Sequence, residues 1–121
     1  MSRIGRLPVH ELALCGAIAD IVTRRAGARR VAAVHVRIGE LRQVVPETLA
    51  FCWTMVTDGT DLAGAELEIE RVPTVLHCRA CDQSLPMSGG FAIACAACGS
   101  FDVEITTGEE FDVTALDLAV A

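Results

Sequence analysis

The sequence has 121 residues, 52% of them hydrophobic, and a formal net charge of −6. This length predicts one compact unit, or one unit with a small insert, and the composition excludes a wholly disordered chain. No run of about eighteen apolar residues is present, which excludes a simple membrane-spanning helix, and residues 1–8 lack the apolar stretch of a secretory signal. We therefore expect a cytoplasmic protein without a membrane partner.

The first two predicted elements are a helix and a strand. Residues 10–25 are expected to form a helix, because apolar residues recur every three or four positions and Gly27 is a stop signal. Residues 31–38 are expected to form a strand, in which apolar and polar residues alternate up to Gly39. His35 alternates with the apolar residues and is interpreted as a surface or second-layer histidine.

Three further elements follow along the chain. A second helix is predicted over 46–57, since Pro46 suits a first helical turn and apolar residues repeat behind it. Residues 58–61 are predicted to be a loop, and residues 65–72 a strand whose glutamates face solvent. A last strand is predicted over 109–119, where a slip in the alternation indicates a bulge.

Between the last two predicted strands lies a cysteine-rich insert, residues 73–105. Two CxxC pairs stand thirteen residues apart and are followed by a glycine, Gly99. Two residues between thiols let one tight turn aim both sulfurs at a single ion, and two such turns supply the tetrahedral S₄ set that structural zinc prefers. The insert is therefore predicted to bind zinc through its four cysteines, Cys78, Cys81, Cys95 and Cys98.

Three other interpretations of the paired cysteines compete with zinc. A thioredoxin-like redox site needs only one CxxC and leaves the second pair unexplained. A rubredoxin-like iron site would have few aromatic residues to shield it. A catalytic zinc keeps one coordination position open, which four thiolates would close. Cys15 and Cys52 lie on predicted apolar helix faces and are interpreted as buried thiols. His77 is interpreted as a solvent-facing neighbour of Cys78, with a spare or exchanging ligand as the alternative.

The first helix opens with Val9-His10-Glu11-Leu12, which alone is an ordinary charged helix start. Three further motifs follow it in order: Val-Arg-Ile-Gly-Glu-Leu, Val-Val-Pro-Glu-Thr-Leu-Ala-Phe and CxxC-x13-CxxC. In this combination the chain resembles the HypA/HybF family of hydrogenase nickel incorporation proteins, over residues 9–121.

The resemblance implies a nickel metallochaperone that is not an enzyme. Family members bind Ni(II) at an N-terminal Met-His-Glu and hold a structural zinc in the cysteine module. With the GTPase HypB they pass nickel to the large subunit of [NiFe]-hydrogenase, and in some organisms toward urease. By position His10 is the imidazole ligand of nickel, and Glu11 is a ligand or an orienting acid.

The fold class expected from these elements is α+β: two helices packed on a small mixed three-stranded sheet, with an inserted zinc-ribbon-like module that has four cysteine ligands. The nickel-binding domain is expected to comprise residues 9–72 and 106–121, and the zinc-binding module residues 73–105. The sequence is compatible with both a monomer and a dimer.

The chain departs from the family pattern in two places. Eight residues precede Val9, where the family has its initiator methionine, so an internal Val9 offers an amide rather than a free amine. We expect the native chain to start at Val9, read as Met from a GTG codon, and residues 1–8 to be a start-site artefact. Some members also place an acid near the middle of the chain close to nickel; Glu40 and Glu47 are the candidates here.

Two other functions compete with the nickel carrier. A zinc-ribbon module for protein interaction or nucleic-acid binding explains the cysteines alone, but residues 58–121 carry a charge of −10 against +4 for residues 1–57. An acidic insert disfavours nucleic acid, which needs a basic face. A thiol redox enzyme is the second competitor. No serine–histidine–aspartate set, phosphate loop or paired carboxylates indicate catalysis, so GTP hydrolysis is expected from a partner.

Overall fold

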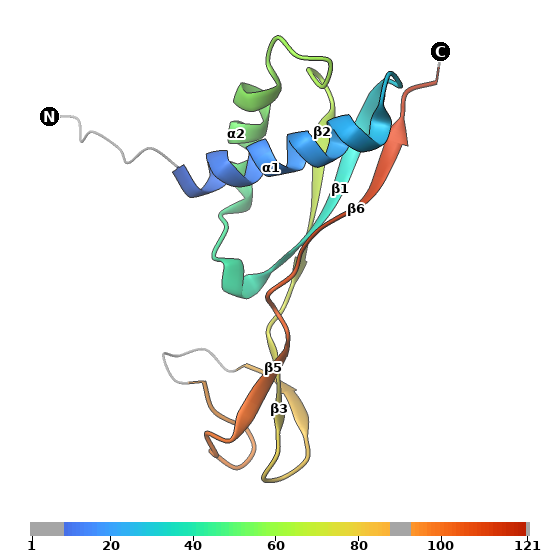
Figure 1. The fold of residues 1–121 in the computed structure, drawn as a ribbon. Helices are drawn as coiled ribbons and strands as arrows, with labels where there is room; N and C mark the ends of the chain where they lie inside the picture. Colours follow the sequence, from blue (N-terminus) through green and yellow to red (C-terminus); the bar gives the residue numbers. More distant parts are fainter. Residues whose placement is uncertain (1–8, 88–92, 121) are drawn as a thin grey trace, which may run out of the picture. The chain divides into compact units, whose positions relative to one another are not determined.

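The computed structural model describes residues 9–87 and 93–120 (Figure 1). Its elements in chain order are α1 Val9–Ala26, β1 Val31–Gly39, a 3₁₀ helix Glu40–Arg42, α2 Pro46–Thr57, β2 Glu66–Val72, β3 Val75–Cys78, β4 Ser84–Pro86, β5 Val103–Thr107 and β6 Phe111–Leu118. The strands form two three-stranded sheets, ordered β2-β1-β6 and β4-β3-β5. Within the two described ranges, no helix has the length and apolar character needed to span a bilayer.

The expected fold class is confirmed, since two helices accompany a small three-stranded sheet and the four cysteines gather in an inserted second sheet region. The predicted strand over 109–119 is β6, whose exposure pattern changes phase at Thr114 and Ala115. Residues 1–8, for which a start-site artefact is expected, lie outside the described residues.

Backbone contacts divide the chain into two compact units. Among the described residues, the first comprises 9–36, 44–69 and 113–120, and the second comprises 37–43, 70–87 and 93–112. The first contains both helices, and the second contains the four cysteines. The domain boundaries expected from the sequence remain a prediction.

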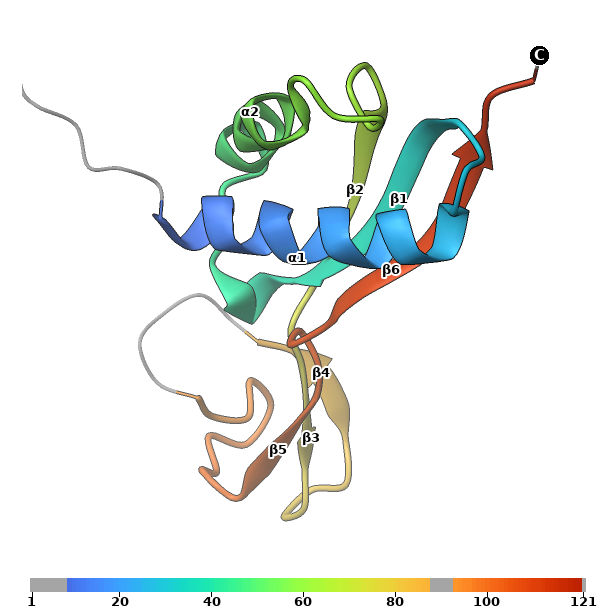
Figure 2. The same cartoon turned by 45° about the horizontal axis from the view of Figure 1, so that its top comes forward.

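The core of the first unit lies between the two helices and the sheet. Helix α1 runs across one face of the sheet, with β2 and β6 on either side of β1 (Figure 2). Its apolar residues recur at i and i+4, which directs one stripe inward. The fully or almost fully buried core side chains are Cys15, Ile18, Val22, Val34, Val36, Leu49, Cys52 and Trp53. The indole N–H of Trp53 donates to the carbonyl of Ala65 at 2.8 Å, which joins α2 to the start of β2.

The two helical cysteines are buried thiols, as expected. Cys15 and Cys52 have no exposed surface, and the Cys15 Sγ donates to the carbonyl of Leu49 at 3.3 Å. Burial, and then the neighbouring Cys52 and Glu11, raises the pKa of Cys15 to about 12. Cys15 is therefore a neutral thiol that packs as a small hydrophobic group.

The second unit contains a close backbone crossing at two glycines. The amide of Gly39 donates to the carbonyl of Glu110 at 2.7 Å, and the amide of Leu41 donates to the carbonyl of Gly108 at 2.8 Å. A Cβ on Gly39 would collide with the backbone of Gly108, and a Cβ on Gly108 would lie 2.6 Å from the hydroxyl oxygen of Thr74. Only glycine fits at either position. From the sequence, Gly39 was predicted only to end its strand.

Candidate metal centre

The two CxxC pairs fold into two turns with the same hydrogen bonds. The amide of Asp82 donates to the carbonyl of Cys78 at 2.8 Å, and the amide of Gly99 donates to the carbonyl of Cys95 at 2.9 Å. Both donors adopt left-handed backbone conformations, with φ of 57° at Asp82 and 78° at Gly99. The glycine was anticipated from the sequence. Asp82 was not, although it holds the equivalent position directly after the second cysteine of its pair.

A second matched pair of hydrogen bonds closes each turn. The amide of Cys78 donates to the carbonyl of Gln83 at 2.8 Å, and the amide of Cys95 donates to the carbonyl of Ser100 at 2.9 Å. The two CxxC pairs thus have the same backbone conformation. In each turn, backbone hydrogen bonds alone position the two cysteines.

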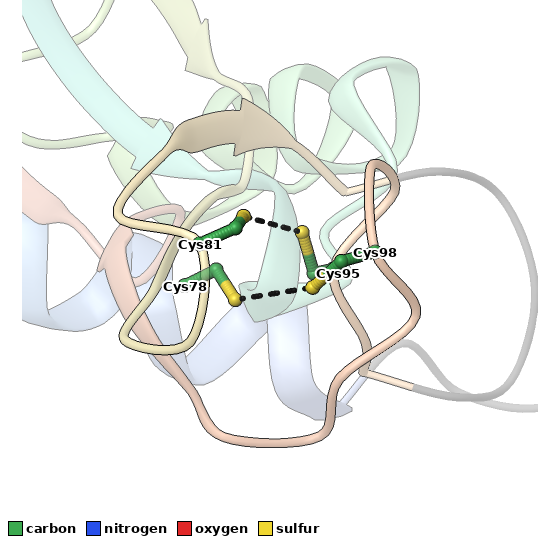
Figure 3. A group of neighbouring side chains, drawn as sticks. All are labelled: Cys78, Cys81, Cys95 and Cys98. Atoms are coloured by element: carbon green, nitrogen blue, oxygen red, sulfur yellow. Dashed lines mark hydrogen bonds between the residues drawn. The ribbon is translucent and has the colours of Figure 1, made fainter.

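The four sulfurs converge on one point (Figure 3). The Sγ atoms of Cys78 and Cys98 lie 3.6 Å apart, as do those of Cys81 and Cys95, and all four lie within 4.8 Å of one another. A zinc–sulfur bond of about 2.3 Å places the corners of a tetrahedron about 3.8 Å apart. The arrangement therefore fits a tetrahedral S₄ metal site, and the cysteines are not joined as disulfides.

The second sheet holds the first turn in place. β3 ends at Cys78 and pairs antiparallel with β4 and with β5, where Cys78 lies opposite Val103. Arg79 adds a backbone hydrogen bond from its amide to the carbonyl of Asp102 at 3.0 Å, and side-chain ion pairs with Asp102 and Glu104 at 2.9 and 3.4 Å. These ion pairs are half-exposed, so the backbone pairing supplies most of the positioning.

The thiols hold their protons unequally. The backbone N–H groups of Cys98 and Ala97 lower the pKa of Cys95 to about 6. Burial, and then hydrogen bonds with the other three thiols, raises the pKa of Cys81 to about 12. A bound divalent cation would remove this difference between the pKa values of the thiols, because it stabilises all four cysteines as thiolates.

His77 stands beside the cysteine group without joining it. Its Nδ1 lies 2.9 Å from the hydroxyl of Ser84, and its Nε2 lies 3.3 Å from a carboxylate oxygen of Asp82. Both ring nitrogens thus have partners in the second unit. Among the described residues, the group of metal-ligand atoms within reach of one ion consists of the four cysteines.

The predicted nickel residues occupy the first turn of α1. The side chain of His10 is exposed, whereas Glu11 is only 9% exposed. Consecutive helical residues point about 100° apart, so the two side chains leave the helix in different directions. In the described ranges they are not gathered with a third histidine, cysteine or carboxylate ligand. Of the two other candidate acids, Glu40 is half-buried in the 3₁₀ helix and Glu47 is exposed in the first turn of α2.

A model of one protein family matches residues 9–118. Its description is hydrogenase/urease nickel incorporation, metallochaperone, HypA. A hydrogenase maturation factor HypA from Geotalea uraniireducens is 40% identical over 110 residues, which cover 91% of this chain and 99% of that protein. The same factor from Geobacter metallireducens is 39% identical with the same coverage.

Solved structures show the same fold at lower sequence identity. The solution structure of the nickel metallochaperone HypA from Helicobacter pylori has a TM-score of 0.61 and 19% identity, covering 92% of this chain and 98% of that one. A second solution structure of a HypA protein has a TM-score of 0.59 and 19% identity, covering 95% and 98%. At 19% identity, these two similarities support the fold of this chain but not its function.

Proposed function

The chain belongs to the HypA family of hydrogenase/urease nickel incorporation metallochaperones, and from that membership we propose that it binds Ni(II) at the start of α1 and delivers the ion for maturation of a [NiFe]-hydrogenase. The observation that carries the proposal is the family match, which begins at residue 9 and includes His10 and Glu11. His10 supplies the imidazole, and Glu11 is a ligand or orients one.

The start of a helix suits this cargo. The first amides of a helix have no acceptor within it, so backbone nitrogens near His10 can bind a metal without breaking a helical hydrogen bond. Nitrogen donors in a near-planar arrangement suit Ni(II). The exposed imidazole of His10 is also accessible to a receiving protein, which a carrier needs in order to release its ion.

The four-cysteine group is proposed to hold a structural zinc ion. Four thiolates fill the tetrahedral coordination of zinc and leave no position for a substrate. When bound, the ion supplies positive charge and cross-linking rather than reactivity. Cys78, Cys81, Cys95 and Cys98 would join the two turns through it, and this link would stabilise the small second sheet.

The proposed partners follow from a carrier without catalytic machinery of its own. A GTPase of the HypB type would supply nucleotide hydrolysis, and the hydrogenase large subunit would receive the nickel; urease maturation factors are further candidate receivers. The competing proposal, a zinc-ribbon adaptor without nickel, predicts the same cysteine chemistry and no specific nickel binding.

Loss of the His10 imidazole should abolish tight nickel binding. We expect His10→Ala to weaken Ni(II) affinity by roughly 100-fold or more, since even partners of metal ligands contribute about 10- to 100-fold. Isothermal titration of the zinc-loaded chain that begins with methionine in place of Val9 measures this. His35→Ala is the matched control, because His35 belongs to the same unit and bonds Asp117. Equal nickel affinity in the wild type and His10→Ala would refute the assignment and favour the adaptor.

A further inference from the structure

One edge of the first sheet lacks a neighbouring strand. The order β2-β1-β6 places β2 at the side, and among the described strands β1 is its only partner. Half of the backbone N–H and C=O groups of a strand face each side. β2 therefore has a row of donors and acceptors directed away from β1, which another extended chain can pair with.

A groove of about 450 Å³ lies at the first part of this edge. One wall is the α2 surface with Ala50, Trp53 and Thr54, and the other is the segment 63–68, whose last three residues belong to β2. Successive strand residues point to opposite faces, and Glu66, Leu67 and Glu68 all line the cavity, so at the start of β2 it lies along the strand edge rather than over one face. Because Trp53 is 2% exposed and bonds the Ala65 carbonyl, the groove has a fixed base.

The strand side of the groove is acidic. Glu66 and Glu68 are exposed and line it, together with Asp58. None of its described lining residues is basic, and in the described ranges neither Glu66 nor Glu68 forms an ion pair. Outside the groove, Glu68 raises the pKa of His35 after Asp117, and Arg30 lines a neighbouring cavity together with Glu66. The lining of the groove itself is therefore negatively charged.

The helix side of the groove is a single stripe of α2. Its lining residues Ala50, Trp53, Thr54 and Thr57 recur at three- and four-residue spacing and so share one face of the helix. Across the groove, the half-buried Leu67 adds apolar surface between the exposed Glu66 and Glu68. The groove therefore has an apolar helix side opposite an acidic strand side.

We propose that an extended segment of a partner protein, with alternating basic and apolar residues, docks in this groove and adds a strand to β2. Its backbone would pair with the free edge. Its arginine or lysine side chains would face Glu66 and Glu68, and its apolar side chains would face the stripe of α2 that contains Ala50 and Trp53. Alternation along a strand delivers the two kinds of side chain to the two sides at once.

A second copy of this chain is a poor occupant. Pairing β2 with another β2 would place glutamates 66, 68 and 70 against the same glutamates, and like charges on neighbouring strands are destabilising. The same charges disfavour nucleic acid. The proposal involves none of the proposed metal ligands, so its test is independent of the nickel proposal.

The test uses the full chain and an acetylated, amidated peptide of about eight residues, a typical strand length or slightly more, in which arginine and valine alternate. We expect saturable binding, with hydrogen-exchange protection of the β2 amides and chemical-shift changes at Ala50 and Thr54, which line the groove on α2. The double variant Glu66→Lys, Glu68→Lys should weaken binding roughly tenfold, because two surface ion pairs become repulsions. Asp20→Lys with Asp112→Lys changes the net charge equally at exposed positions that do not line the groove and should leave binding close to that of the wild type.

Two control peptides separate strand addition from simple attraction. A glutamate–valine peptide should not bind. An arginine–valine peptide N-methylated at every residue keeps its charge but cannot donate a ladder hydrogen bond, and it should bind far more weakly. Equal binding of the methylated peptide, or shifts located away from β2, would overturn the proposal. Protection of the β2 amides that grows with protein concentration in the absence of peptide would overturn it in favour of a second copy.

Discussion

At the scale of single residues, the strictest requirement lies where Gly39 meets Gly108. The backbone of one occupies the space in which a side chain of the other would stand, and Gly108 also has a φ of 119°, which L-residues rarely adopt. Nothing in the local sequence distinguishes these glycines from the others, because the contact joins positions nearly seventy residues apart. Long-range contacts of this kind leave no periodic signal.

Replacing Gly39 by alanine should destabilise the protein. We expect the free energy of unfolding to fall by about 2–4 kcal/mol, since overpacking against backbone cannot be relieved by a rotamer change. Denaturation followed by circular dichroism, which reports both units, measures the loss. Gly16→Ala is the matched control: it lies inside α1 with no atom near a new Cβ, so it should gain about 0.5–1 kcal/mol. Unchanged unfolding of Gly39→Ala would contradict the crossing.

A second residue-scale feature is the pair of His35 and Asp117. The His35 Nε2 lies 2.8 Å from the Asp117 carboxylate, and this hydrogen bond raises the pKa of His35 above its usual 6.5. A histidine whose pKa rises on folding stabilises the folded state below the unfolded pKa. That contribution is lost as the pH rises through the folded pKa. The alternation in the sequence predicts a surface or second-layer histidine at this position, but it does not indicate the partner eighty-two residues away.

Removal of the carboxylate charge should return the His35 pKa toward 6.5. An NMR titration of the imidazole resonances of Asp117→Asn measures this, with Asp112→Asn on the same strand as control. A smaller rise should persist in Asp117→Asn, because Glu68 also acts on His35. If His35 in the wild type titrates at or below 6.5, the pair is not formed in solution.

At the scale of elements, α1, α2, β1 and β2 could be predicted because each has a regular apolar period, and β6 could be predicted although its alternation breaks at Thr114 and Ala115. The short strands β3, β4 and β5 could not. They have four, three and five residues, too few for a period, and their pairing follows from the two cysteine turns. The doubled CxxC spacing nevertheless predicted which four sulfurs come together, because a turn between paired thiols is a local property.

The two cysteine turns should depend on a shared ion. Cys98→Ser removes one corner of the S₄ set and is expected to lose most bound zinc, with collapse of the amide signals of residues 75–87 and 93–107. Elemental analysis and a two-dimensional amide spectrum measure both effects. Cys52→Ser, which changes a buried thiol of α2, should retain one zinc per chain. Full zinc content in Cys98→Ser would show that the ion is not held by four cysteines.

At the scale of the whole molecule, the family could be recognised from the order of several motifs, and its fold followed. The nickel site could not be derived in the same way. A histidine and a glutamate at a helix start are an ordinary pattern, and Glu11 is buried while His10 is exposed. Their assignment as ligands therefore rests on position within the family, and backbone nitrogens would have to complete the set.

The most direct test of the carrier function compares nickel binding by two zinc-loaded chains. One begins at Met1, and the other begins with methionine in place of Val9, so that a free amine precedes His10. Calorimetric titration should show about one tightly bound Ni(II) per chain in the shorter protein, in line with the preference of Ni(II) for nitrogen donors, and weaker binding in the longer one. Equal tight binding would show that the amine is dispensable. Absence of specific binding by both chains would contradict the nickel carrier and leave a zinc-stabilised adaptor.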